Sequence, residues 1–157
     1  VYELARVMAK EEEAVFFLGR HVGYPVALEG ALKLKEIAYM HAEGFAAGEL
    51  KHGPIAVIEE GTPVFVVVPP KGRDQLHDKV VSNIQEIRAR GARTIVLAER
   101  GDDDVKPYAD TFVGLPACST LLQPLVAAVQ AFACELATAK GHDVDQPRNL
   151  AKSVTVE

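Results

Sequence analysis

Glu36 and Lys33, a carboxylate and an ammonium three residues apart, are the side chains of this sequence best suited to proton transfer. They lie in residues 25–43, which are predicted to form a helix, and a spacing of three or four residues brings side chains together on one helix face. Glu36 could then act as a general base while Lys33 stabilises its charge. Judged from spacing alone, the pair is more typical of a solvated helix face, where exposed Glu–Lys pairs are common.

The predicted helix over residues 25–43 has two contrasting stripes at 100° per residue. One stripe consists mostly of small residues, which would let the helix lie close to a sheet: Ala27, Ala31, Leu34 and Ala38. The opposite stripe would have to line a cleft in order to be functional: Glu29, Lys33, Glu36, Met40 and Glu43. The alternative is a solvated face on which Glu29 and Lys33 form a favourable i,i+4 pair.

Two side chains further along the sequence carry groups used in acid–base or nucleophilic catalysis. His52 directly precedes a Gly-Pro pair, which predicts a turn that presents the imidazole. From the residues alone, a structural or merely exposed His52 is as good an interpretation as a functional one. Lys152 lies in the segment 141–157, and its amine could form a Schiff base with a carbonyl sugar if burial lowered its pKa. The alternative for Lys152 and Arg148 is a frayed, solvated C-terminus.

The sequence predicts no metal site and no cofactor. Its two cysteines, Cys118 and Cys134, have neither the spacing of zinc ligands nor the number needed for a disulfide framework. Five histidines are present without the paired spacing of metal ligands: His21, His41, His52, His77 and His142. No glycine-rich dinucleotide motif and no P-loop occurs. The acidic run 102–104 is expected to be a solvated loop tip with no ligand.

Short apolar runs alternate with helical patterns along the whole sequence. The runs that predict buried strands are 14–19, 63–69, 94–98 and 111–115, and the predicted helices are 25–43, 74–90 and 120–140. Continuous rather than alternating apolar strands indicate a sheet that is covered on both faces. We therefore expect an α/β fold with a mainly parallel, twisted sheet flanked by helices on both faces.

The loop after the first predicted strand, residues 19–23, lies where such sheets commonly bind ligands, at the carboxyl end of a strand. Pro25 is well placed to open the next helix, whose N-terminal amides could meet an anion. The loop contains no phosphate-binding motif, so a tight turn that requires glycine is the favoured interpretation.

Length and composition indicate one globular domain over residues 1–157. The chain is 48% hydrophobic and 25% charged, with a net charge of -5. It has no basic excess for binding nucleic acid or an anionic membrane and no apolar run long enough to span a membrane, and we expect no signal peptide. We expect a cytoplasmic protein. Residues 1–10 are predicted to form a helix that continues from an upstream segment, so the chain is expected to belong to a longer protein.

Two segments carry a specific resemblance. They are YPVALEGALKLKEIAYMHAEGFAAGELKHGP, residues 24–54, and DVDQPRNLAKSVTVE, residues 143–157. Both resemble the second sugar-isomerase (SIS) lobe of the glucosamine-6-phosphate synthase family, in the order in which they occur in that family. The resemblance covers about a third of the chain directly, and the α/β pattern between the two segments fits an SIS domain.

The resemblance implies a role for each candidate residue. The family residue that matches Glu36 moves a proton between C1 and C2 of the sugar, and the one that matches Lys33 assists it. The residue that matches His52 serves ring opening of fructose 6-phosphate in the active site of the neighbouring subunit. The lysine that matches Lys152 forms an imine with the open-chain ketose, and the backbone at Ala151 lies against the substrate.

The resemblance also implies that the full protein is a homodimer that makes glucosamine 6-phosphate from fructose 6-phosphate and glutamine, with no metal or organic cofactor. The family's glutaminase domain and its first SIS lobe, which holds the sugar phosphate, have no counterpart in this sequence. The chain alone is therefore expected to be inactive. Two alternatives remain open, namely a non-catalytic module that binds sugar phosphates, as in some transcriptional regulators, and a dimerisation scaffold.

Overall fold

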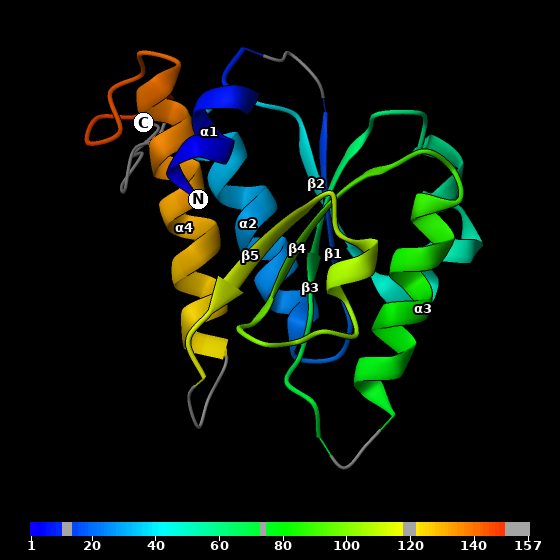
Figure 1. Cartoon of the computed structure of the whole chain (residues 1–157). Helices are drawn as coiled ribbons and strands as arrows, with labels where there is room; N and C mark the ends of the chain where they lie inside the picture. The colour runs from blue at the N-terminus through cyan, green and yellow to red at the C-terminus, as the bar shows by residue number, and fades with distance from the viewer. Residues whose placement is uncertain (11–13, 73–74, 118–121, 150–157) are drawn as a thin grey trace, which may run out of the picture.

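The computed structural model describes residues 1–10, 14–72, 75–117 and 122–149, apart from the side chains of residues 122 and 123. Its centre is a five-stranded sheet in which every pair of neighbouring strands is parallel, in the order β2-β1-β3-β4-β5 (Figure 1). The strands are β1 (Val15–Gly19), β2 (Ala42–Ala46), β3 (Pro63–Val67), β4 (Arg93–Glu99) and β5 (Thr111–Leu115). The predicted parallel sheet is confirmed.

Helices cover both faces of the sheet (Figure 1). One face carries α1 (Tyr2–Met8), α2 (Gly23–Ile37) and α4 (Leu122–Ala139). The other face carries α3 (Leu76–Arg88) and the short 3₁₀ helices η1 (Ala47–His52) and η2 (Pro54–Val57), and η3 (Lys106–Tyr108) lies between β4 and β5. The expected three-layer arrangement is therefore confirmed. None of the helices in the described ranges is long and apolar enough to cross a membrane.

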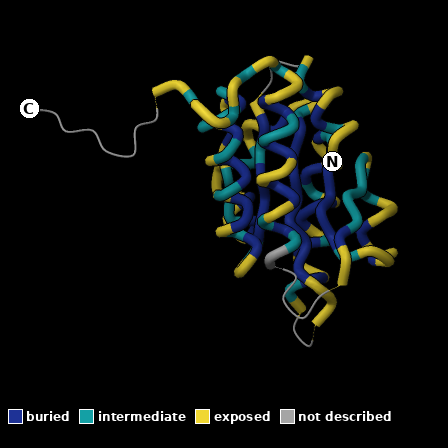
Figure 2. The backbone as a smooth tube through the Cα atoms, turned by 90° about the vertical axis from the view of Figure 1, so that its left-hand side faces the viewer, coloured by how far each residue is buried: buried dark blue, intermediate teal, exposed yellow. Residues whose placement is uncertain are grey.

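The sheet separates two apolar cores because successive residues of a strand point to opposite faces. On the α2 and α4 side, Phe65 of β3 stacks on Phe17 of β1 and contacts Phe132 of α4, both at ring-centroid distances of 4.7 Å. Val64 and Val66, the neighbours of Phe65, belong to the core under α3. Figure 2 shows the buried backbone concentrated in the middle of the molecule. The small-residue stripe of α2, predicted to pack on the sheet, is buried in the first core.

The helix predicted to reach residue 43 ends at Ile37, so that prediction is wrong at its C-terminal end. Tyr39 has a φ of 54°, in the left-handed region, and the Met40 N–H turns back to the carbonyl of Leu34 at 3.2 Å. Residues 42–46 then form the edge strand β2 beside β1. Met40 and Glu43 consequently do not extend the charged stripe of α2. The sequence of β2, AEGFA, contains residues with low β-propensity, which explains why no strand was predicted there.

The loop between β1 and α2 is the tight turn that the sequence favoured. A Cβ atom on Gly19 would lie 2.0 Å from the carbonyl oxygen of Gly23, so only glycine fits at this position. The turn starts α2 at the carboxyl edge of the sheet, which here means the side where the carboxyl ends of the parallel strands lie. Since α2 runs back against the strand direction, its last turn, with Glu36, lies at the opposite side, the amino edge.

Candidate functional site

Lys33 and Glu36 are in contact, as their spacing on α2 predicts. The Lys33 ammonium donates a hydrogen bond to Glu36 Oε2, and Glu29 Oε1 lies 4.0 Å from the same Nζ atom. Gln130 of α4 donates to Glu29 Oε1 at 2.8 Å, which ties the charged stripe to the neighbouring helix. The side chains of Lys33 and Glu36 remain 30% and 25% exposed, so both are accessible from solvent.

The electrostatics of this pair favour the charged form of the lysine. The hydrogen bond to Glu36 raises the pKa of Lys33 above its ordinary value, with smaller contributions from the charges of Glu36 and Glu29. Partial burial opposes this shift. Lys33 is therefore charged around neutral pH and lies in contact with the Glu36 carboxyl group.

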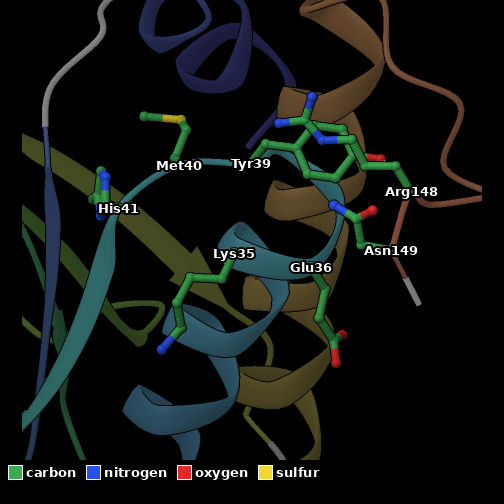
Figure 3. A pocket seen from close by; sticks show the side chains of 7 residues that line it. All are labelled: Lys35, Glu36, Tyr39, Met40, His41, Arg148 and Asn149. Carbon is green, nitrogen blue, oxygen red and sulfur yellow. The ribbon is translucent and has the colours of Figure 1, made fainter. Parts of the chain in front are cut away.

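Glu36 also lines an open pocket of about 410 Å³ at the end of α2 (Figure 3). Its lining consists of the last turn of α2, the connection to β2 and the start of the C-terminal tail: Lys35, Glu36, Tyr39, Met40, His41, Arg148 and Asn149. In Figure 3 the side chains of Arg148 and Asn149 reach from the tail into the pocket toward α2. Lys35, Glu36 and Arg148 give this lining charges of both signs.

Arg148 is not frayed, contrary to one interpretation of the sequence. Its backbone N–H donates to Tyr39 Oη at 2.8 Å, and its guanidinium carbon lies 4.1 Å from the centre of the Tyr39 ring. These contacts join residues 109 positions apart and bring the tail beside Glu36. Ala151 and Lys152, the other predicted site residues of the tail, lie outside the described residues.

His52 does not join Glu36 within one chain. It ends η1, which follows β2 at the carboxyl edge of the sheet on the α3 side, whereas Glu36 lies at the amino edge on the α4 side. The His52 side chain is 72% exposed, and its Nδ1 atom lies 2.7 Å from Glu49 Oε2. The imidazole is therefore presented to solvent before the Gly-Pro turn, as predicted.

Comparison with known proteins identifies the family of this domain. The family model of the SIS domain matches residues 8–137. The chain belongs to the SIS domain family.

Relatives of this SIS domain are close in sequence. It is 76% identical over 160 aligned residues to the glutamine–fructose-6-phosphate aminotransferase [isomerizing] of Streptomyces coelicolor, which covers all of this chain and 26% of the relative. The chain thus spans about a quarter of the length of that relative. Among solved structures, the C-terminal domain of glucosamine-fructose-6-phosphate aminotransferase from Francisella tularensis matches with 40% identity and a TM-score of 0.78. That match covers 93% of this chain and 41% of the Francisella chain.

The fold of an SIS domain does not by itself determine a function. The sugar isomerase domain of an RpiR transcription factor from Sphaerobacter thermophilus matches with a TM-score of 0.71 but only 15% identity, over 89% of this chain and 78% of that one. This likeness shows the fold alone. The choice between an enzyme and a sensor module therefore depends on the residues of the site.

The acidic run 102–104 of this SIS domain contains a buried residue, so its prediction as a fully solvated loop tip is wrong for Asp102. The Asp102 carboxylate lies 2.7 Å from Nε2 of the buried His77 in the first turn of α3. Asp104 is exposed and lies 2.7 Å from Nζ of Lys71. His77, Asp102 and Asp104 are close enough to hold a metal ion, but the Lys71 ammonium already pairs with these carboxylates. The 25-residue separation of His77 and Asp102 left no signal in the sequence.

Proposed function

We propose that this SIS domain is the isomerase lobe of a glutamine–fructose-6-phosphate aminotransferase, which makes glucosamine 6-phosphate from fructose 6-phosphate and glutamine. The observation that carries the proposal is the partly exposed Glu36 carboxylate, held by Lys33 at a pocket that the C-terminal tail borders. The 76% identity to the Streptomyces coelicolor aminotransferase supports it. A sensor module would need to bind a sugar phosphate but would not need a base.

The reaction requires a proton transfer that Glu36 is placed to perform. The substrate has a ketone at C2 and a hydroxymethyl group at C1, whereas the product has an amino group at C2 and an aldehyde at C1. After nitrogen has replaced the C2 oxygen, which leaves as water, a base must remove one proton from C1 and return a proton to C2. Glu36 is the proposed base, and the Lys33 ammonium stabilises its charge before and after the transfer.

The remaining candidate residues act before this proton transfer. We assign His52 to ring opening of the sugar, which needs an acid and a base at the anomeric oxygen and the ring oxygen. Lys152 supplies the amine that condenses with the C2 ketone, releasing water and giving an imine; ammonia released from glutamine by the glutaminase domain then displaces the Lys152 amine and leaves the imine nitrogen on C2. We assign the backbone at Ala151 to contact with the same substrate.

The full protein is proposed to be a cytoplasmic homodimer in which each site takes His52 from the neighbouring subunit. Residues 1–157 form one SIS domain, with residues 141–157 as its catalytic tail. The other three quarters of the relative's length would supply the glutaminase domain and the first SIS lobe with its phosphate site. Because phosphate contacts position the reacting carbons, the 157-residue chain alone is expected not to make glucosamine 6-phosphate.

Product formation by the full-length protein tests the proposal. With fructose 6-phosphate and glutamine, the unmodified protein should form glucosamine 6-phosphate, and Glu36→Gln should reduce the rate by about 10²–10⁴-fold, the usual contribution of a general base. Glu43→Gln is the matched control, because Glu43 is an exposed glutamate on β2 that does not line the pocket. Equal rates for the unmodified protein and Glu36→Gln would contradict the assignment.

A further inference from the structure

Tyr39 has an unusual backbone for its residue type. It follows the end of α2 with a φ of 54°, in the left-handed region that helix ends usually fill with glycine or asparagine. A residue with a large side chain pays a conformational cost in this region, and such outliers concentrate where a side chain has a task. The contacts of the Tyr39 side chain show what that task could be.

Three groups of the C-terminal segment meet the Tyr39 side chain. The Arg148 N–H donates to the phenolic oxygen at 2.8 Å, and the Arg148 guanidinium lies over the ring at 4.1 Å. The imidazole of His142 contacts the ring with a centroid distance of 4.7 Å and an interplanar angle of 56°. A tyrosine can satisfy this hydrogen bond and both ring contacts together, whereas glycine or asparagine at the same backbone position could not.

These contacts hold the tail close to Glu36. Tyr39 is three residues beyond Glu36, and both line the same pocket as Arg148 and Asn149 (Figure 3). Lys152 follows Arg148 by four residues, which an extended chain spans in at most about 14 Å. Holding Arg148 beside Glu36 would therefore limit how far from the Glu36 pocket the chain length lets Lys152 reach.

We propose that Tyr39 is a positioning residue that clamps the start of the C-terminal tail, so that the amine of Lys152 and the carboxylate of Glu36 act on the same sugar. This inference rests on the proposed function for the roles of Lys152 and Glu36. The clamp itself, defined as Tyr39 with Arg148 and His142, rests on the contacts alone. The end of α2 would then contribute to the site in two ways. Glu36 provides the base, and Tyr39 holds the start of the tail in place.

The first experiment examines the clamp without reference to activity. Trypsin cleaves after arginine, and the Arg148–Asn149 bond follows the side chain that stacks on Tyr39. In the full-length protein, Tyr39→Asn keeps a residue that tolerates the left-handed backbone and should speed cleavage of this bond at least fivefold. The Arg90–Gly91 bond after α3 is the internal control and should be cleaved at an unchanged rate. Unchanged cleavage after Arg148 would overturn the clamp.

The second experiment measures imine formation. Borohydride reduces the C=N bond of a lysine–sugar imine, and mass spectrometry then locates the modified lysine. With fructose 6-phosphate, Tyr39→Asn should trap Lys152 at least tenfold more slowly and lower kcat by a similar factor, with the thermal unfolding midpoint unchanged. Tyr39→Phe keeps the ring and loses only the phenolic oxygen, so its rate of Lys152 trapping should lie between those of the unmodified protein and Tyr39→Asn.

The outcomes separate the two proposals. If unmodified protein traps Lys152 and Tyr39→Asn traps it equally fast, the positioning role is wrong while the proposed function stands. If Tyr39→Asn loses activity only in proportion to a lowered unfolding midpoint, its role is structural and the inference is also wrong. If the unmodified protein traps no sugar on Lys152, the proposed function of the tail fails, and with it the catalytic purpose of the clamp.

Discussion

Glu36 and Lys33 owe their contact to helix geometry alone, because residues three apart on a helix are neighbours whatever surrounds them. That contact could therefore be predicted from the sequence. The contact between Tyr39 and Arg148 could not, because it joins residues 109 positions apart and depends on where α4 and the tail return to α2. The sequence alone left Arg148 as part of a solvated end, and it gave no sign that Tyr39 adopts a left-handed backbone.

The raised pKa of Lys33 predicts how the pair contributes to stability with pH. Because the folded-state pKa lies above the ordinary value of 10.5, the contribution is fully present below pH 10.5 and is lost as the pH rises through the folded-state pKa. Lys33→Met should therefore lower the free energy of unfolding at pH 7, by about 0.2–1 kcal/mol for a partly exposed ion pair. The difference from the unmodified protein should shrink above pH 10.5.

Urea unfolding between pH 7 and pH 11 measures this difference. Lys35→Met is the control, since Lys35 is an exposed lysine on the same helix for which the described part of the chain shows no ion pair. A Lys33→Met difference that stays constant to pH 11, or that Lys35→Met reproduces, would contradict the role of the ion pair.

At the scale of elements, four of the five strands and the three longer helices could be predicted from apolar runs and helical periodicity. The exception, β2, has Ala-Glu-Gly-Phe-Ala at the sheet edge, and its pairing with β1 rather than its own propensity makes it a strand. Contacts made by loops could not be predicted either. The buried pair of Asp102 and His77 joins the connection after β4 to the first turn of α3, and nothing in the sequence indicates that these two residues are partners.

Removal of this buried carboxylate should destabilise the α3 side of the sheet. Asp102→Ala leaves the buried His77 without its hydrogen-bond partner, which typically costs about 1–3 kcal/mol. The measurement is the free energy of unfolding in urea at pH 7. Asp103→Ala is the control because Asp103 is exposed and its only described partner is the surface residue Lys106, so little change is expected. Equal effects of both substitutions would refute a special role for the buried pair.

At the scale of the whole molecule, Glu36 and His52 lie at opposite edges of the sheet and on opposite faces. One chain therefore cannot supply both groups to one small sugar, whereas two chains related by a two-fold axis could. This separation is what a site shared between subunits requires. Sequence motifs pointed to both residues but could not show that they face different ways, because that depends on the crossover from β2 to β3.

Mixed dimers test whether the site is shared. Full-length Glu36→Gln and His52→Ala proteins should each be inactive as separate homodimers. After subunit exchange, a heterodimer should contain one site with both native groups, and random mixing should restore about a quarter of the native sites. Recovery of glucosamine 6-phosphate formation is the readout. Inactive mixtures, with exchange verified by mass spectrometry, would place His52 and Glu36 in the same subunit's site, whereas an active His52→Ala homodimer would remove His52 from the reaction.

The central claim is that Glu36 moves a proton between C1 and C2 of the sugar, and a label at C1 tests it most directly. Fructose 6-phosphate deuterated at C1 should lose deuterium from C1 during turnover by the full-length protein, to C2 of the product or to water, as mass spectrometry and NMR can follow. Glu36→Gln should bind the sugar phosphate and keep the deuterium at C1. Loss of the label from C1 by Glu36→Gln at the rate of the unmodified protein would contradict the account.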